Sequence, residues 1–239
     1  MTPAILLSML LLAAPETPAF APEACGKSPQ SSCEAAREFV GRLGGKKGLV
    51  AFKAARLLYL YEDGRPVDRQ VDLETYDPLM KASVPAHLRF PIPMALSKRA
   101  LGHKVRLADA HTPEGEYTIC QSIAASEYTY FLSVSYPNQR DVDAAVKEKR
   151  FDAKALERVA HSQHPGSCPD FYSALGGTIG IHGAPTAMAR DIAKAEASDP
   201  ESVNVTVNDW TLGCLGVENR HIRFLAKEVK LGTPILIVP

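Results

Sequence analysis

Short apolar runs separated by Gly and Pro restrict the fold of this 239-residue chain more than any other feature of its sequence. Two such runs, at residues 49–52 and 57–61, precede Asp63-Gly64, a dipeptide typical of hairpin turns. Further strands are expected at residues 91–96, 117–123, 130–134, 178–181, 203–207 and 235–238. Strands therefore dominate the expected core, and the sequence predicts a mainly β (α+β) domain.

Residues 22–47 are expected to form a helical extension ahead of the strands. Ser31 and Glu34 fit a capping box, and the helix that follows is expected to end before Gly44-Gly45. Its apolar face consists of Ala35, Phe39 and Leu43.

Three later stretches also have apolar residues at helical spacing. Two of them cover residues 141–161 and 185–197. Asn219 is expected to cap the third. The apolar face of that helix consists of Ile222, Leu225, Ala226 and Val229. We expect these helices to lie around the strands, and about residues 141–175 to form a helical insertion.

The first residues of the chain predict export. Residues 4–14 form an almost unbroken apolar run of eleven residues, about half the length that a helix needs to cross a bilayer. The small-residue triplet Ala19-Phe20-Ala21 follows, so residues 1–21 are predicted to be a cleaved signal peptide. Residues 48–239 are then one exported domain, located in the periplasm or cell envelope without a stable transmembrane anchor.

Five cysteines in an exported chain predict disulfide bonds, and the odd number leaves one thiol unpaired or in an intermolecular bond. Any four of them allow three connectivities. Cys25 and Cys33 are the most plausible pair, because their bond staples an otherwise loose N-terminal segment. A bond between Cys120 and Cys168 closes a longer loop, and this pairing leaves Cys214 free.

Composition and motif spacing exclude several classes of partner. The 27 basic and 27 acidic residues give a formal net charge of zero, which supplies no cationic field for nucleic acid or an anionic membrane. His161, His164 and Cys168 have loosely metal-like spacing but lack a fourth ligand nearby, so no metal is expected. Neither Gly177-x-x-Gly180 nor Gly44-Gly45-Lys46-Lys47 completes a dinucleotide or phosphate motif, and no cofactor is predicted.

The strongest local signal for chemistry is Thr211-Leu212-Gly213-Cys214. Gly213 allows backbone N–H groups to approach a reacting carbonyl group beside the Cys214 thiol. Upstream, His182 ends a strand-like run, where a rigid scaffold would direct its imidazole toward Cys214 as a general base. Spacing alone leaves open a structural interpretation, in which Cys214 is a buried small hydrophobic residue and His182 a core histidine.

Several separated motifs resemble those of the L,D-transpeptidase catalytic domain (YkuD-like) family. His182-Gly183 and Thr211-Leu212-Gly213-Cys214 match its signature, a His-Gly pair followed downstream by Ser/Thr-x-Gly-Cys. The other matching stretches are Gly102-His103-Lys104, Asp109, residues 112–117, Ser135-Tyr136-Pro137-Asn138, Asp209-Trp210 and Gly232-Thr233-Pro234. The resemblance spans about residues 49–238. The run Asp-Trp-Thr-x-Gly-Cys is similar to that of the murein L,D-transpeptidase subgroup, which includes cross-linking enzymes and hydrolytic relatives.

The resemblance implies a β-sandwich-like catalytic domain with peripheral helices, acting in the bacterial cell envelope. In the family reaction the enzyme attacks the stem-peptide bond after diaminopimelate and releases D-alanine. It then passes the acyl group to the amine of a second stem, which forms a 3-3 cross-link. The expected partners are peptidoglycan stem peptides and, for hydrolytic relatives, a murein-linked protein.

The resemblance also implies roles for the site residues. Cys214 is the nucleophile and His182 its base, with the Gly183 carbonyl group orienting the imidazole. The oxyanion or substrate-binding residues are Gly213, Thr211 and Leu212. A neighbouring imidazolium is expected to stabilise the thiolate and so lower the pKa of Cys214.

One departure from the family pattern concerns Gly216. Many members carry an Arg there, two residues after the nucleophile, which can pair with a substrate carboxylate through two hydrogen bonds. Its absence leaves the choice between cross-linking and hydrolysis open. Three hypotheses follow: a transpeptidase, a peptidoglycan peptidase or amidase that uses water as the acceptor, and a non-catalytic envelope-binding domain in which Cys214 forms a disulfide.

Overall fold

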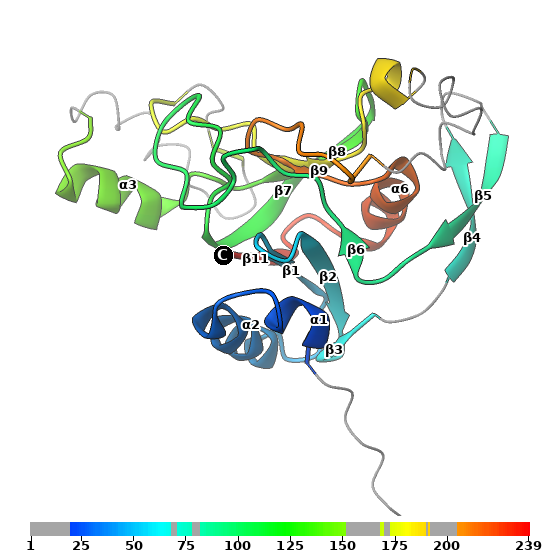
Figure 1. Cartoon of the computed structure of the whole chain (residues 1–239), viewed down its shortest axis with the longest axis horizontal. Coiled ribbons are helices and arrows are strands. Elements are labelled where there is room, and N and C mark those ends of the chain that lie inside the picture. Colours follow the sequence, from blue (N-terminus) through cyan, green and yellow to red (C-terminus); the bar gives the residue numbers. More distant parts are fainter. Residues whose placement is uncertain are drawn as a thin grey trace, which may run out of the picture.

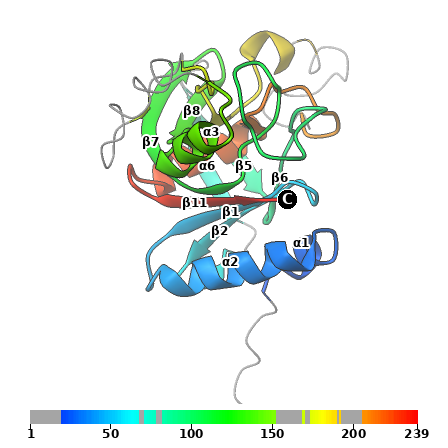
Figure 2. The same ribbon diagram turned by 90° about the vertical axis from the view of Figure 1, so that its left-hand side faces the viewer.

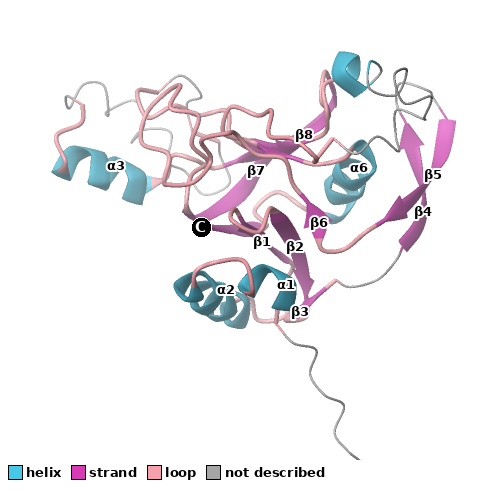
Figure 3. Cartoon of the chain, viewed as in Figure 1, coloured by secondary structure: helices cyan, strands magenta, loops and turns pink. Residues whose placement is uncertain are grey.

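A nine-stranded sheet and a separate two-stranded hairpin form the framework of the protein (Figure 1). The computed structural model describes residues 20–67, 71–77, 82–151, 168–169, 173–189, 191 and 205–239. The strands are β1 (Gly48–Phe52), β2 (Leu57–Glu62), β3 (Arg65–Pro66), β4 (Val71–Asp77), β5 (Ala82–Leu88), β6 (Ile92–Pro93), β7 (Gly115–Ser126), β8 (Thr129–Val134), β9 (Gly180–His182), β10 (Leu215–Gly216) and β11 (Pro234–Val238). Helices with described bounds are α1 (Pro22–Cys25), α2 (Gln30–Arg42), α3 (Gln139–Lys147) and α6 (Asn219–Glu228) (Figure 3).

The large sheet curls, so that its two halves face each other across the main core. Its strand order is β10-β9-β8-β7-β11-β1-β2-β3, with β6 paired to β2 outside this path. Leu49 and Leu60 from one half and Leu132 and Ile181 from the other are almost completely buried between them. Strands thus dominate the core, and the predicted mainly β, sandwich-like fold is confirmed.

The predicted β-hairpin at the start of the domain is confirmed. β1 and β2 pair antiparallel, with Gly48 opposite Tyr61. Asp63-Gly64 then turns the chain into β3, with both residues at positive φ, 51° and 73°. β11 pairs parallel with β1, where Leu49 lies opposite Ile235, and antiparallel with β7. β11 therefore lies in the middle of the sheet.

Three strand predictions need correction. The strand expected at residues 91–96 is reduced to β6, and the one expected at residues 178–181 begins at Gly180 and continues to His182. Residues 205–207 form a turn, while residues 203–204 lie outside the described residues. The hairpin β4–β5 and the two-residue β10 are not predicted, because polar residues interrupt the apolar pattern of β4 and β10 is too short to have one.

α2 covers the outer face of β1, β2 and β11 (Figure 2). The predicted helix is confirmed, but its N-cap residue is Pro29 and no side chain caps it. The predicted capping box of Ser31 and Glu34 is wrong, because the helix already begins at Gln30. Its buried face consists of Ser32, Cys33, Ala36, Phe39 and Val40, whereas Ala35 is exposed.

The two later helices begin at other residues than predicted. Asn138 caps α3 through a capping box with Asp141, so this helix starts at Gln139. The N-cap of α6 is Glu218, and the predicted cap at Asn219 is wrong because Asn219 is already the first helical residue.

Other segments with predictions are described only in part. Residues 186–189 are helical, whereas residues 192–197 of the helix predicted at 185–197 lie outside the described residues. The same is true of residues 152–167 and 170–172 in the predicted insertion, which stays a prediction.

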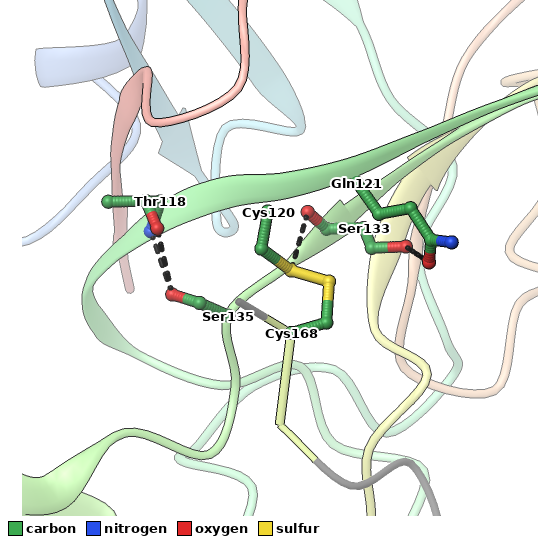
Figure 4. The surroundings of a disulfide bond; sticks show 6 residues. All are labelled: Thr118, Cys120, Gln121, Ser133, Ser135 and Cys168. Carbon is green, nitrogen blue, oxygen red and sulfur yellow. Dashed lines mark hydrogen bonds between the residues drawn. A yellow bond between two sulfur atoms is a disulfide. The ribbon is translucent and has the colours of Figure 1, made fainter. Parts of the chain in front are cut away.

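Both predicted disulfides are present. Cys25 in α1 is bonded to Cys33 in α2. Cys120 is bonded to Cys168 beside the hydrogen bond from Thr118 N to Ser135 Oγ (Figure 4). Cys120 lies at a β-bulge, where the register between β7 and β8 shifts, so the bulge separates its side chain from the regular alternation of the strand.

The N-terminal region bears on the predicted export. Residues 1–19 lie outside the described residues, so the signal peptide stays a prediction. Among the residues that the structure describes, no helix is long and apolar enough to cross a membrane.

Candidate active site

Strand alternation on β8, β9 and β10 separates the core from the candidate site. Leu132, Ile181 and Leu215 point into the main core and are fully buried. Phe131 pairs with His182 across β8 and β9, and Gly216 pairs with His182 across β10 and β9. Continued by one residue, the same parallel register sets Cys214 beside Gly180, two residues before His182, and the Gly180 N–H group acts on the thiol. The predicted nucleophile and base thus lie on neighbouring segments, and no hydrogen bond joins their side chains in the described part of the chain.

His182 is held as a neutral imidazole with a defined tautomer. Its Nδ1 atom lies 2.8 Å from Gly183 O, and because a carbonyl oxygen only accepts hydrogen bonds, Nδ1 carries the proton and Nε2 the lone pair. The ring lies among three aromatic rings, Tyr128 at 4.5 Å, Phe131 stacked at 5.4 Å and Trp210 edge-on at 5.4 Å between centroids. This burial lowers the pKa of His182 to about 4, so the imidazole is a free base at neutral pH.

The Cys214 thiol is free and half-buried. Its Sγ–H group points to Thr178 O at 3.4 Å. Burial raises the pKa of the thiol to about 11, although the Gly180 N–H group and the charge of Lys104 act in the opposite direction. The expected lowering of the thiol pKa is therefore wrong, because desolvation outweighs the groups that favour the thiolate. The resting pair is a neutral thiol and a neutral imidazole.

The turn before Cys214 is fixed by the predicted motif residues themselves. The Thr211 hydroxyl donates to Cys214 O at 2.8 Å, and Thr211 N donates to Leu96 O at 3.0 Å. Gly213 has φ +130°, and a Cβ there would lie 2.7 Å from His111 O. Thr211 and Gly213 therefore shape the turn, while the Leu212 side chain is 83% exposed beside it.

Gly183 and Asn219 lock the segment that carries His182. A Cβ at Gly183 would lie 2.4 Å from Asn219 Oδ1 and 2.8 Å from Tyr128 O, so no larger residue fits. Asn219 Oδ1 accepts a hydrogen bond from Ala184 N at 3.0 Å. The side chain that was expected to cap α6 thus holds the strand of the base against that helix.

The model of the L,D-transpeptidase catalytic domain, YkuD, matches residues 46–237. The chain belongs to this family. Members of the L,D-transpeptidase family act on peptidoglycan peptides in the cell envelope. No curated protein matches the sequence.

Solved structures similar to this chain include three from different bacteria. Bd1075 from Bdellovibrio bacteriovorus is 20% identical, with TM-score 0.39, over 81% of this chain and 48% of its own. L,D-transpeptidase 3 from Mycobacterium tuberculosis is 11% identical, with TM-score 0.41, over 81% and 61%. The helical cell shape determining protein Pgp2 from Campylobacter jejuni is 17% identical, with TM-score 0.39, over 84% and 54%. This chain therefore spans about half to three fifths of these proteins.

The family's Arg position is filled here by a neighbouring aromatic ring. A Cβ at Gly216 would lie 2.7 Å from Trp210 Cζ2 and 3.1 Å from Thr211 Cγ2. The Trp210 indole is held in place by its Nε1–H group, which donates to Val205 O at 2.8 Å. A guanidinium side chain at residue 216 is therefore incompatible with the Trp210 ring that packs on His182.

The family motifs Gly102-His103-Lys104 and Asp109 and the start of residues 112–117 lie in the loop of residues 97–114, beside the turn of the nucleophile. Lys104 Nζ is 2.8 Å from Asp109 Oδ1, and both side chains are buried. The Lys53 ammonium, fully buried, donates to the carbonyl groups of Ala100, Gly102 and Thr112. Since each buried charge is paired or hydrogen-bonded, these residues fix the loop shape.

Several site residues were not singled out from the sequence. Tyr128 and Phe131, which contact the His182 ring, and Gly180, which contacts the thiol, have no local motif, and only the folded arrangement brings them to the site. Asp209-Trp210 was noted as a family match, which was the one available signal for the ring contact. No group of three His, Cys, Asp or Glu residues in the described part of the chain could hold a metal ion, and His161 and His164 lie outside it.

Proposed function

We propose that the protein is an exported peptidoglycan L,D-transpeptidase in which Cys214 is the nucleophile and His182 the base. The observation that supports this most is the free thiol in the turn before β10, the strand that pairs with the segment carrying an imidazole whose Nδ1 is bound to Gly183 O. That bond leaves the Nε2 lone pair as the proton acceptor, and burial keeps it unprotonated at neutral pH.

The reaction follows from these groups. As Sγ attacks the carbonyl carbon after diaminopimelate, the thiol proton moves to His182 Nε2. The imidazolium then protonates the departing amine of D-alanine, which leaves an acyl-enzyme thioester. An acceptor amine attacks this thioester and loses its proton to Nε2; the C–S bond then breaks, the imidazolium returns the proton to the Cys214 sulfur, and the new amide is the 3-3 cross-link. Backbone N–H groups near Gly213 and Cys214 are the proposed oxyanion donors.

Because the resting pair is neutral, Cys214 is a thiol and not a thiolate before substrate binds. The pKa of Cys214 is raised to about 11 and that of His182 is lowered to about 4, so proton transfer without substrate is strongly unfavourable. We infer that deprotonation accompanies attack on the carbonyl group. This arrangement keeps an otherwise reactive thiol protonated between turnovers.

A second candidate is a hydrolase of the same fold, in which water replaces the acceptor amine. It is favoured by Gly216, where Trp210 excludes the arginine that many members carry. The non-catalytic hypothesis takes Cys214 to form a disulfide; within the chain the four other cysteines are bonded to each other, so only a second chain could supply its partner.

Product analysis separates these activities. Diaminopimelate-type sacculi are incubated with the processed protein or its Cys214→Ala variant, and the muropeptides are identified by mass spectrometry. New 3-3 linked dimers that require the thiol establish transpeptidation. Thiol-dependent loss of links or shortening of stems supports hydrolysis instead, and identical products from both proteins contradict both proposals.

A further inference from the structure

A cavity rich in arginine lies next to the turn that precedes the candidate nucleophile. Its volume is about 420 Å³, and its lining residues are Arg99, Val105, Arg106, Asp109, His111, Arg150 and Phe151. Five of them belong to the loop of residues 97–114 and two follow α3, so the cavity is built from the scaffold around the site.

The cavity adjoins the turn that carries the thiol. His111, one of its lining residues, has its carbonyl oxygen 2.7 Å from the place where a Cβ at Gly213 would be. Leu107 N, on the same loop, donates to Ala174 O in the segment that leads to Thr178. Because Thr178 O contacts the Cys214 thiol, the loop touches the nucleophile's surroundings on two sides.

The charged side chains around the cavity differ in whether they already have ion-pair or hydrogen-bond partners. The Asp109 carboxylate already has partners within the protein, since it pairs with Lys104 and accepts hydrogen bonds from three backbone N–H groups. Arg150 donates to Val105 O at 2.9 Å and lies 2.8 Å from Glu148. In the described part of the chain, neither Arg99 nor Arg106 pairs its guanidinium with a carboxylate, and both residues are exposed.

Two unpaired guanidinium groups at a cavity mouth favour a planar anion over a neutral ligand. A carboxylate accepts paired hydrogen bonds from guanidinium, which gives it orientation as well as affinity. The Nδ1 atom of His111 is also buried without a hydrogen-bond partner among the described residues, 3.9 Å from Asp109 Oδ2. This adds a polar atom that a bound ligand or water can satisfy.

We propose that Arg99 and Arg106 form a subsite for a carboxylate of the peptide substrate, next to the bond that Cys214 attacks. The inference rests on the proposed function, because it takes the ligand to be the stem peptide. The subsite supplies a cation that Gly216 cannot supply, and it does so from a different loop. The chain therefore selects acidic peptides without an arginine after its nucleophile.

Binding to an inactive protein tests the subsite without turnover. The full chain with Cys214→Ala is titrated with a soluble tetrapeptide stem and with the same peptide carrying carboxamides in place of its α-carboxylates. Adding Arg99→Ala or Arg106→Ala is expected to weaken binding of the first peptide about tenfold, whereas Arg106→Lys loses less. The carboxamide peptide is expected to bind weakly to every variant.

Arg65→Ala is the matched control, because Arg65 is an exposed arginine on β3, at the opposite edge of the sheet from β10. It is expected to leave binding unchanged. Equal affinity for both peptides, or equal loss in Arg65→Ala and Arg106→Ala, overturns the subsite.

Turnover separates failure of the subsite from failure of the proposed function. In the active protein, Arg106→Ala is expected to raise KM about tenfold with little change in kcat. Thiol-dependent turnover that neither arginine affects refutes the subsite alone. Arginine-dependent binding by a protein that never converts the stem peptide refutes the proposed function and leaves the subsite standing.

Discussion

The two ends of the curled sheet use their outer faces in opposite ways. Around β1, β2 and β11, the residues that point away from the main core meet α2 and form a second apolar core with Phe39, Phe52 and Tyr59. Around β8 and β9, the corresponding outward residues are Phe131 and His182, whose rings stack, and Cys214 lies in the turn just before β10. These are surrounded by aromatic rings and by the loops before the nucleophile rather than by α2.

This difference shows how the alternation of side chains along the strands can serve stability in one region and chemistry in another. The strands β1, β2, β8, β9 and β11 bury alternate residues in the main core, so their outer faces are free to take another role. Covering that face with an apolar helix yields stability, whereas leaving it under loops yields a site. Substitutions at the α2 end should therefore affect the free energy of unfolding, and those at the β9 end should affect activity.

The largest effect is expected from His182→Gln. Glutamine keeps a polar neutral side chain but cannot accept the thiol proton, so turnover of stem peptides should fall by about 10³- to 10⁴-fold. The urea midpoint should change little by comparison. A variant that keeps a tenth of the activity would refute the proposed role of His182 as base.

At the other end, Phe39→Ala should cost about 3–5 kcal/mol in the free energy of unfolding, because Phe39 is 3% exposed in the core under α2. Chemical denaturation measures this loss, and kcat of the folded fraction should be unchanged. Glu38→Ala is the neighbouring control, since its side chain is 75% exposed and should shift stability by less than about 0.5 kcal/mol. A large fall in kcat for Phe39→Ala would break the comparison.

Acid should lower the free energy of unfolding through His182, at the end of the sheet that carries the candidate site. The pKa of this residue is about 4 in the folded chain against an ordinary value of 6.5, so the folded state disfavours the protonated form. The free energy of unfolding should therefore be unaffected by this group above pH 6.5 and should fall by about 3 kcal/mol as the pH drops from 6.5 to about 4, because the unfolded state binds the proton first.

Unfolding of the native chain and of His182→Gln at several pH values isolates this contribution. The native chain should lose more stability than the variant between pH 6.5 and 4. Other acid-sensitive groups cancel in the difference, among them Asp109, whose pKa is lowered by Lys104 and backbone N–H groups against the effect of burial. Parallel curves for the two proteins would mean that His182 is not the buried neutral base described here.

The smallest effects concern two glycines, and the change in the free energy of unfolding should have opposite signs at the β9 end and the α2 end of the sheet. Gly216→Ala should destabilise by about 1–3 kcal/mol, because the added Cβ meets Trp210 and Thr211. Gly41→Ala in α2 should stabilise by about 0.5–1 kcal/mol, because nothing lies within 4 Å of that Cβ. Thermal unfolding of both variants tests the pair, and equal shifts would show that Trp210 gives way at no cost.

Local chemistry explains what could be predicted from the sequence. The hairpin before Asp63-Gly64 and the disulfide between Cys25 and Cys33 depend on residues close in the chain. The family motif brought His182 and Cys214 to attention for the same reason, since each half of the signature is short. The mainly β fold followed from runs of apolar residues whose length alone favours strands.

Long-range packing explains what could not be predicted. The direction of the Cys214 pKa shift depends on how deeply neighbouring segments bury the thiol, which no local pattern contains. Asn219 looked like a helix cap because its residue type favours that role, yet its oxygen accepts from Ala184, 35 residues earlier. The contact between the Trp210 ring and Gly216 likewise depends on how the turn packs against the strand, which the sequence does not show.

The position of β11 in the middle of the sheet has a consequence for when the protein becomes active. β11 pairs with β7 on one side and β1 on the other, so the two halves of the sheet are joined only after residues 234–238 arrive. Domains emerge from synthesis with their N-terminal parts first, and these residues therefore come late. We expect a nascent chain to carry an unfinished sheet while it is being made and translocated. For the exported transpeptidase proposed above, the thiol would then acquire its working surroundings only after delivery, which would protect the cell from premature activity.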